Sequence, residues 1–273
     1  MVINTKNLHN FIKAHEIWIF LISAPISSAI FVYGIQLHLI PGRLYMQGRF
    51  FVLFFLLLAL VKFTRGNSGL KDLFSPMFIW KVPFKWYIFT FFFASSIACL
   101  TLYLKALYLD RDFNNFTINY AVFGNLELAF NVIFFALVSE VVWVSFAVRQ
   151  LSKSMNPFFA SQIVGVIWAL WWIPIVMFNV GVIENIPIIA LIINMMGAAG
   201  MCAIVYEQTK SGICVWILQF MLNFSCILFP VTPSADVPTY WAFSIIYFLV
   251  MLGLMYFVLQ RSKVTQKLKL SRE

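Results

Sequence analysis

Eight apolar runs divide this sequence, and each is about as long as the roughly 20-residue helix that crosses a bilayer. They cover residues 17–39, 46–63, 86–108, 121–148, 158–180, 186–206, 212–230 and 239–260. The second run is the weakest because its strictly apolar stretch is short, so seven spans are the alternative. Only 11% of the residues are charged, against about 25% in soluble domains. The sequence therefore predicts an all-α, polytopic membrane protein with about eight transmembrane helices in a single domain, residues 1–273.

Lys and Arg residues fall unequally on the two sides that eight spans would define. Fifteen lie on the side that holds both termini, and four, Arg43, Arg49, Lys105 and Arg111, lie on the other. Because cytoplasmic loops carry the excess of basic residues, we expect both termini to face the cytoplasm from the cell (plasma or inner) membrane. The basic tail 261–273 is then cytoplasmic. The net charge of +9 follows from this topology, and its expected partner is the lipid bilayer and no nucleic acid.

Two stretches carry patterns of their own. Between Thr64 and Lys85, apolar residues at helical spacing alternate with polar ones, which predicts a helix lying in the membrane interface. The sixth run contains Gly197 and Gly200 among alanines, and small residues at such spacing let helices approach closely in lipid. We therefore expect this face of the sixth span to pack tightly against a neighbour.

The cysteines give no indication of a metal site or another cofactor. All four lie inside predicted spans and form no Cys-x-x-Cys or Cys-x-x-His spacing: Cys99, Cys202, Cys214 and Cys226. A structural zinc site needs four such ligands close together, so we expect buried free thiols that pack as small apolar side chains. No metal and no cofactor is predicted.

Glu140 lies deep within the fourth apolar run, and an ionisable residue inside a membrane helix indicates a functional site by default. Its segment, SEVVWVSFAV, resembles the Glu-Glu-x-x-x-Arg helix of the CAAX protease and bacteriocin-processing family of membrane proteins. Glu140 matches the second glutamate and Trp143 a common aromatic residue. Ser139 stands at the first glutamate and Val144 at the arginine.

Two later segments extend the resemblance. VIWALWWIP is similar to the family's Phe-x-x-x-His helix, with Trp168 at the phenylalanine and Trp172 at the histidine. The segment that follows Tyr206 is similar to the His-x-x-x-Asn helix, with Gln219 at the histidine and Asn223 retained. The resemblance covers roughly residues 60–230. It implies a helical bundle of about eight spans, like that of the CAAX proteases, whose motif helices enclose a cavity in the membrane, and an ancestral glutamate-dependent endopeptidase.

The substitutions remove most of the titrating groups that such an enzyme would use. Proton transfer needs a side chain that titrates near the working pH, and Ser139, Trp172 and Gln219 do not. All three histidines of the chain precede residue 39, so none can replace the two that are lost. Arg149 follows Val144 by five residues, which on an α-helix turns its side chain about 140° away.

Glu140 is the one candidate catalytic residue that remains. Gln219 and Asn223 are four residues apart and share one helix face. We expect this face to lie opposite Glu140 and the two amides to form hydrogen bonds with its carboxyl group. One carboxylate and two amides make a weak ligand set for zinc.

Three functions remain open on the sequence. The first is a degenerate family member, a pseudoenzyme, that binds a peptide or a membrane protein partner. The second is an active intramembrane peptidase that uses Glu140 with water and the amides of Gln219 and Asn223. The third is an unrelated transporter or channel component, although the buried charge pairs and broken helices typical of such proteins are not seen.

Overall fold

The computed structural model describes residues 5–112, 116–181 and 185–270, and within these ranges the chain forms helices and no β-strand. The first half contains α1 (Thr5–Ala14), α2 (Glu16–Gln36), α3 (Tyr45–Phe74) and α4 (Phe84–Tyr108). In the second half, α5 (Leu126–Ser139) continues into a π-helix (Glu140–Val148) and the short α6 (Arg149–Leu151). The bundle is completed by α7 (Pro157–Met177), α8 (Ile188–Thr209), α9 (Gly212–Leu228) and α10 (Val237–Leu270).

All eight predicted apolar runs are helical. Seven of the resulting helices are long and apolar enough to cross a membrane, and α9 is a shorter apolar helix of 17 residues. The second run, expected to be the weakest, is in fact part of the longest apolar segment, Gly42–Phe78. At 1.5 Å per residue, α9 is about 26 Å long, which is close to the thickness of the hydrocarbon core. The chain is therefore a multi-pass, all-α membrane protein.

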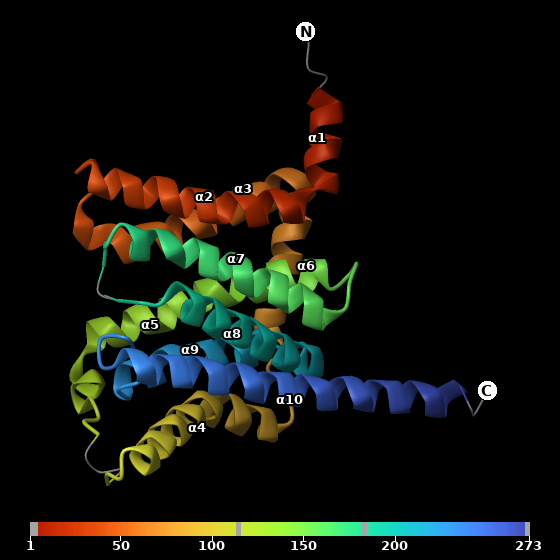
Figure 1. Ribbon diagram of the computed structural model, residues 1–273. Helices are drawn as coiled ribbons and strands as arrows, with labels where there is room; N and C mark the ends of the chain where they lie inside the picture. The colour runs from red at the N-terminus through yellow and green to blue at the C-terminus, as the bar shows by residue number, and fades with distance from the viewer. Residues whose placement is uncertain (1–4, 113–115, 182–184, 271–273) are drawn as a thin grey trace.

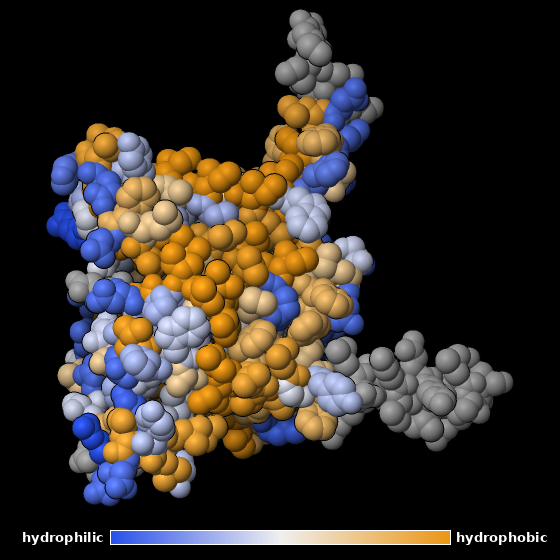
Figure 2. Space-filling view, viewed as in Figure 1, coloured by the Kyte–Doolittle hydropathy of each residue, from blue (hydrophilic) through white to orange (hydrophobic). Residues whose placement is uncertain are grey.

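The spanning helices run side by side between two ends of the bundle (Figure 1). The described parts of both terminal helices emerge at the same end, here called the terminal end, and residues 37–44 and 229–236 lie at the opposite, loop end (Figure 1). Apolar side chains cover the middle of the visible surface, whereas hydrophilic residues gather along the loop end (Figure 2). On α2, for example, Ile22, Ile26 and Ile30 are each more than half exposed. Exposed apolar residues in a continuous belt are suited to contact with lipid tails.

At the terminal end, two helical segments leave the direction of the bundle. The segment after Gly66 departs from α3 because Gly66 adopts φ +65°, a left-handed conformation that glycine reaches without steric cost. Helix α1 also runs crosswise to α2 (Figure 1). The helix predicted within residues 64–85 therefore forms, and its position in the membrane interface stays a prediction. Helix α10 includes the predicted tail as far as Leu270; the side chains of 259–270 and all of 271–273 lie outside the described residues.

Helix α8 occupies the centre of the bundle. Among the long helices without a π-helical or kinked part, it has the most buried residues. A Cβ added at Gly197 would lie 3.3 Å from the Cα atom of Phe248 on α10, and one added at Gly200 would meet the side chain of Met251. The close packing expected for this stripe of small residues is confirmed. A second close approach, between Gly165 of α7 and the backbone of α8, had no counterpart in the sequence pattern.

Candidate functional site

Glu140 begins the π-helix, and all nine residues of that helix are buried. A π-helix closes its hydrogen bonds between residues five apart, so Ser145 lies next to Glu140. The Ser145 hydroxyl donates to Oε1 of Glu140 at 2.7 Å. Single π-helical turns are frequent at functional sites, and an intact π-helix requires the surrounding structure to support it.

The expected hydrogen bonds between Glu140 and the amides of the later motif are absent, and this prediction was wrong. Among the described residues, Oε2 of Glu140 and both amide atoms of Gln219 have no hydrogen-bond partner. Both side chains instead neighbour the thiol of Cys202 on α8. Asn223 lies one helical turn further toward the loop end, away from this buried group. Among the described residues, the carboxyl group therefore accepts a hydrogen bond only at Oε1, from Ser145 of its own helix.

Arg149 also differs from its expected orientation. Its backbone N–H bonds to the carbonyl oxygen of Val144, the five-residue spacing of a π-helix, so the 140° calculated for an α-helix does not apply. The guanidinium group lies close enough to Glu140 for electrostatic interaction. It donates from Nε to the carbonyl oxygen of Ser145 at 2.7 Å and from its terminal nitrogens to the carboxylate of Asp72 at 2.8 and 3.2 Å.

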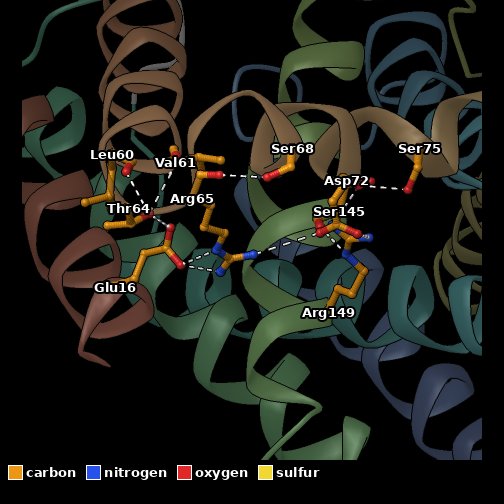
Figure 3. A network of polar contacts seen from close by, with 10 residues as sticks. All are labelled: Glu16, Leu60, Val61, Thr64, Arg65, Ser68, Asp72, Ser75, Ser145 and Arg149. Carbon is orange, nitrogen blue, oxygen red and sulfur yellow. Dashed lines mark hydrogen bonds and ion pairs between the residues drawn. The ribbon is translucent and has the colours of Figure 1, made fainter. Parts of the chain in front are cut away.

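This arginine is the end of a polar network that joins three separate parts of the chain at the terminal end (Figure 3). Glu16, at the start of α2, accepts hydrogen bonds from the Thr64 hydroxyl and from Nε of Arg65 at 2.7 Å. Arg65 also lies 3.9 Å from the carboxylate of Asp72, which binds Arg149. The two acidic and two basic side chains balance in charge. The network therefore ties α2, α3 and the π-helix together.

Two other motif residues pack in the core. Trp143 and Trp168 stack with their ring centroids 5.7 Å apart, and Trp143 also meets the edge of Trp171. Val144 is fully buried among apolar neighbours, and Ser139 is buried one residue before the π-helix. The two tryptophans at motif positions thus stabilise the packing of α7 against the π-helix.

Arg49 holds the remaining motif tryptophan in place. Its buried guanidinium lies over the rings of Trp171 and Trp172, 4.0 and 5.1 Å from their centroids, a favourable cation–π geometry. It donates to the carbonyl oxygen of Trp171 at 2.6 Å and to the Ser28 hydroxyl at 3.0 Å. In the same turn, Pro174 lacks the N–H that would bond to the carbonyl oxygen of Leu170, so the helical bonding is interrupted one residue before Trp171. Trp172 is thereby fixed at the former histidine position.

A cavity of about 540 Å³ opens at the loop end, and Trp172 and Asn223 both contribute to its lining. On α3, α5 and α7, the lining residues furthest from the loop end are Phe50, Phe135 and Trp172, and on α9 the corresponding residue is Asn223. Phe50 stacks on Phe135 with 4.5 Å between centroids and meets Trp172 edge-on at 6.3 Å. These three rings, which we call the aromatic floor, line the inner part of the cavity.

Three of the motif residues lie outside the lining of the cavity. Ser139 follows Phe135 by one helical turn, so it lies on the same face of α5 but deeper in the bundle. Ser139, Glu140 and Gln219 do not contribute to the lining of the cavity. Within the described parts of the chain, no three His, Cys, Asp or Glu side chains are grouped so that they could hold a metal ion.

The motif helices can be compared with known proteins. Residues 121–225 match the family model described as type II CAAX prenyl endopeptidase Rce1-like. This segment is Rce1-like. It contains the three motif segments and the helices from α5 to most of α9, which is less than half of the chain. No curated protein matches the sequence.

Residues 121–225 are thus similar to a CAAX protease family, within a chain that forms a multi-pass helical bundle. In this segment, Glu140 stands where the resemblance places the second glutamate and accepts a hydrogen bond from Ser145, while Trp172 and Gln219 stand where it places histidines.

Sequence reasoning missed Ser145 and Asp72 as partners of this region. Ser145 could be found only by assuming a π-helical spacing, which an apolar segment does not reveal. Asp72 carries a clearer signal, because it is the only acidic residue between Thr64 and Lys85. A single acidic residue in a basic stretch is a candidate for an ion pair with a distant arginine.

Exchanging Ser145 for alanine is expected to destabilise the protein by about 1–3 kcal/mol, because both carboxyl oxygens of Glu140 would then be buried without a partner. The free energy of unfolding in detergent micelles measures the effect. Ser154→Ala is the matched control, since the Ser154 hydroxyl is exposed and bonds only within its own turn. Equal stability of the two variants would show that Ser145 does not support the carboxyl group.

Proposed function

We propose that this CAAX-protease-like protein is a degenerate member that binds a peptide or a membrane protein segment without hydrolysing it. The observation that carries the proposal is the aromatic floor. Trp172 occupies the position where the resemblance implies a histidine, and with Phe50 and Phe135 it lines a cavity to which Glu140 does not contribute. Among the described residues, the lining of the cavity contains no His, Asp, Glu or Lys side chain to act as a general acid or base.

The cavity has the chemistry of a site for an extended segment with an apolar side chain. Its volume is within the range of about 300–1,000 Å³ typical of ligand sites. The aromatic floor supplies apolar surface, while Gln47, Asn131 and Asn223 offer amides that can bond to backbone groups. Arg43 adds a positive charge to the lining. If the terminal end faces the cytoplasm, as the basic residues predict, the cavity opens on the opposite side of the cell membrane.

A comparison of protein ends in the membrane fraction of native cells tests the absence of hydrolysis. Wild type, a deletion strain and Glu140→Gln are expected to yield the same set of ends. Ends present in wild type and missing from both other strains would reveal an active peptidase that depends on Glu140. In that case the alternative, with Gln219 and Asn223 as assisting groups, would replace the proposal.

Site-specific photocrosslinking tests binding in the cavity. A photoreactive residue at Asn131 is expected to capture a partner, whereas one at the neighbouring Phe130, which is largely exposed on the apolar surface, is the matched control. Filling the cavity with Asn223→Phe should abolish the product at position 131. Identical products from both positions, or a product that persists in the filled variant, would refute binding in this cavity.

A further inference from the structure

Helix α1 lies across the terminal end of the bundle and not along it. Only His15 separates its last residue, Ala14, from the start of α2 at Glu16. In Figure 1, α1 projects sideways from this point, crosswise to the spanning helices and beyond the side of α2. A helix in this direction, at the end of helices that cross a membrane, runs along the membrane surface.

The residues of α1 divide into an apolar face and a polar face. Leu8, Phe11 and Ile12 are three or four residues apart, so they share one side of the helix. Asn10 and Lys13 lie on the opposite side, by the helical period. Figure 2 shows the same division: the apolar atoms of α1 lie on the side of the apolar belt, and the hydrophilic atoms lie on the side away from it. The apolar face is therefore directed toward the interior of a membrane that the bundle crosses.

The protein itself covers little of this apolar face. Leu8 is 46% exposed and Phe11 is 58% exposed. The contact of α1 with α3 is at its flank, where His9 meets the edge of Phe63 with 5.1 Å between ring centroids. An isolated helix of ten residues is marginal in water, because most helical stability comes from packing of the apolar face. A further apolar medium is therefore needed to hold α1 in its helical form.

The charge of α1 fits the headgroup layer of a bilayer. Its sequence contains two lysines and no acidic residue, and Lys13 is exposed on the polar face. Glu16, the first acidic residue after the helix, pairs with Arg65 and so does not neutralise these lysines. Basic residues beside a membrane are attracted to the anionic lipids of its surface.

We infer that α1 binds the bilayer surface at the terminal end, with Leu8, Phe11 and Ile12 at the boundary between headgroups and acyl chains and Lys13 facing the headgroups. Amphipathic helices of this kind bury their apolar face about 5–10 Å into that boundary. Because α2 begins two residues after α1 ends, the bound helix also fixes the depth of Glu16 in the membrane. Among the described residues, none of α1 lines the cavity at the loop end, so this inference is independent of the proposed function.

Spin labels on the full-length protein in liposomes of phosphatidylcholine and phosphatidylglycerol test the two faces. Labels are attached at Leu8→Cys and at Asn10→Cys, two exposed positions on opposite sides of α1, after replacement of the four native cysteines by alanine. Oxygen concentrates among acyl chains, whereas a nickel chelate stays in water. The label at position 8 should collide mainly with oxygen and the label at position 10 mainly with the chelate.

Two results of this comparison would overturn the inference. Equal access of the nickel chelate to both labels would place the apolar face of α1 in water. A label at position 8 that neither reagent reaches would show that protein covers this face, either a second copy of the chain or another partner.

Hydrogen exchange of the α1 amides in the same liposomes tests the apolar contact without spin labels. Phe11→Gln should raise the exchange rate about tenfold relative to wild type, because an interfacial helix without this ring loses much of its buried apolar area. Asn10→Gln is the matched control, since it places the same side chain on the polar face, and its rate should equal that of wild type. Equal rates in the two variants would mean that lipid does not hold Phe11.

Discussion

Replacing Gly165 by alanine is expected to destabilise the bundle by about 1–3 kcal/mol, the cost of inserting a methyl group where no space exists. The added Cβ would lie 2.6 Å from the Cα atom of Met196 and 2.9 Å from the carbonyl oxygen of Met195. Both atoms belong to the backbone of α8, so relief requires the two helices to separate. Separation would also loosen the contacts of α8 with its other neighbours, because interiors are close-packed.

Two further glycines serve as controls in the same unfolding measurement. Gly253→Ala should leave stability unchanged or raise it slightly, because nothing lies within 4 Å of its added Cβ and alanine favours the helix. The stability of Gly200→Ala should lie between those of Gly165→Ala and Gly253→Ala, because the neighbour of its added Cβ is the flexible side chain of Met251. Equal stability of Gly165→Ala and Gly253→Ala would mean that α7 and α8 pack less closely at Gly165 than in the structure.

The pattern of small residues explains why only one of these close approaches could be predicted. Gly197 and Gly200 share a face of α8 with alanines, and such a stripe indicates close packing whatever the partner is. Gly165 stands alone in an apolar helix, and a single glycine gives no such indication. The apolar runs similarly predicted the helices, because length and hydropathy determine which segments can span a membrane. They could not predict which helices touch.

The surroundings of Glu140 were beyond sequence reasoning for a different reason. An apolar segment without polar periodicity fits an α-helix and a π-helix equally well, so the Ser145 contact and the position of Arg149 could not be derived. The resemblance, which covered roughly residues 60–230, is matched by the family model over residues 121–225. It could not show that Trp172 would line a cavity together with Phe50, because Phe50 belongs to a segment outside the matched residues.

Removing the carboxylate of Glu16 is expected to cost about 3 kcal/mol, the lower end of the range for breaking a buried ion pair. In Glu16→Ala, the Arg65 guanidinium would lose its two hydrogen bonds to Oε2 of Glu16 and keep Asp72, at 3.9 Å, as an ion-pair partner. The lower end applies because the Arg65 side chain is 24% exposed and can recover some hydration. The Thr64 hydroxyl would keep a backbone acceptor, the carbonyl oxygen of Leu60.

A double-mutant cycle distinguishes the ion pair from a simple loss of packing. If the pair dominates, Arg65→Ala should cost far less in the Glu16→Ala background than in wild type, because the charge left unpaired by the first change is then removed. Glu207→Ala is the matched control: its pair with Lys210 is exposed, so its loss should cost under about 1 kcal/mol. Additive effects of the Glu16 and Arg65 exchanges would mean that the charges of the network in Figure 3 add little to the free energy of unfolding. Helix α2 would then be held to α3 mainly by its apolar face.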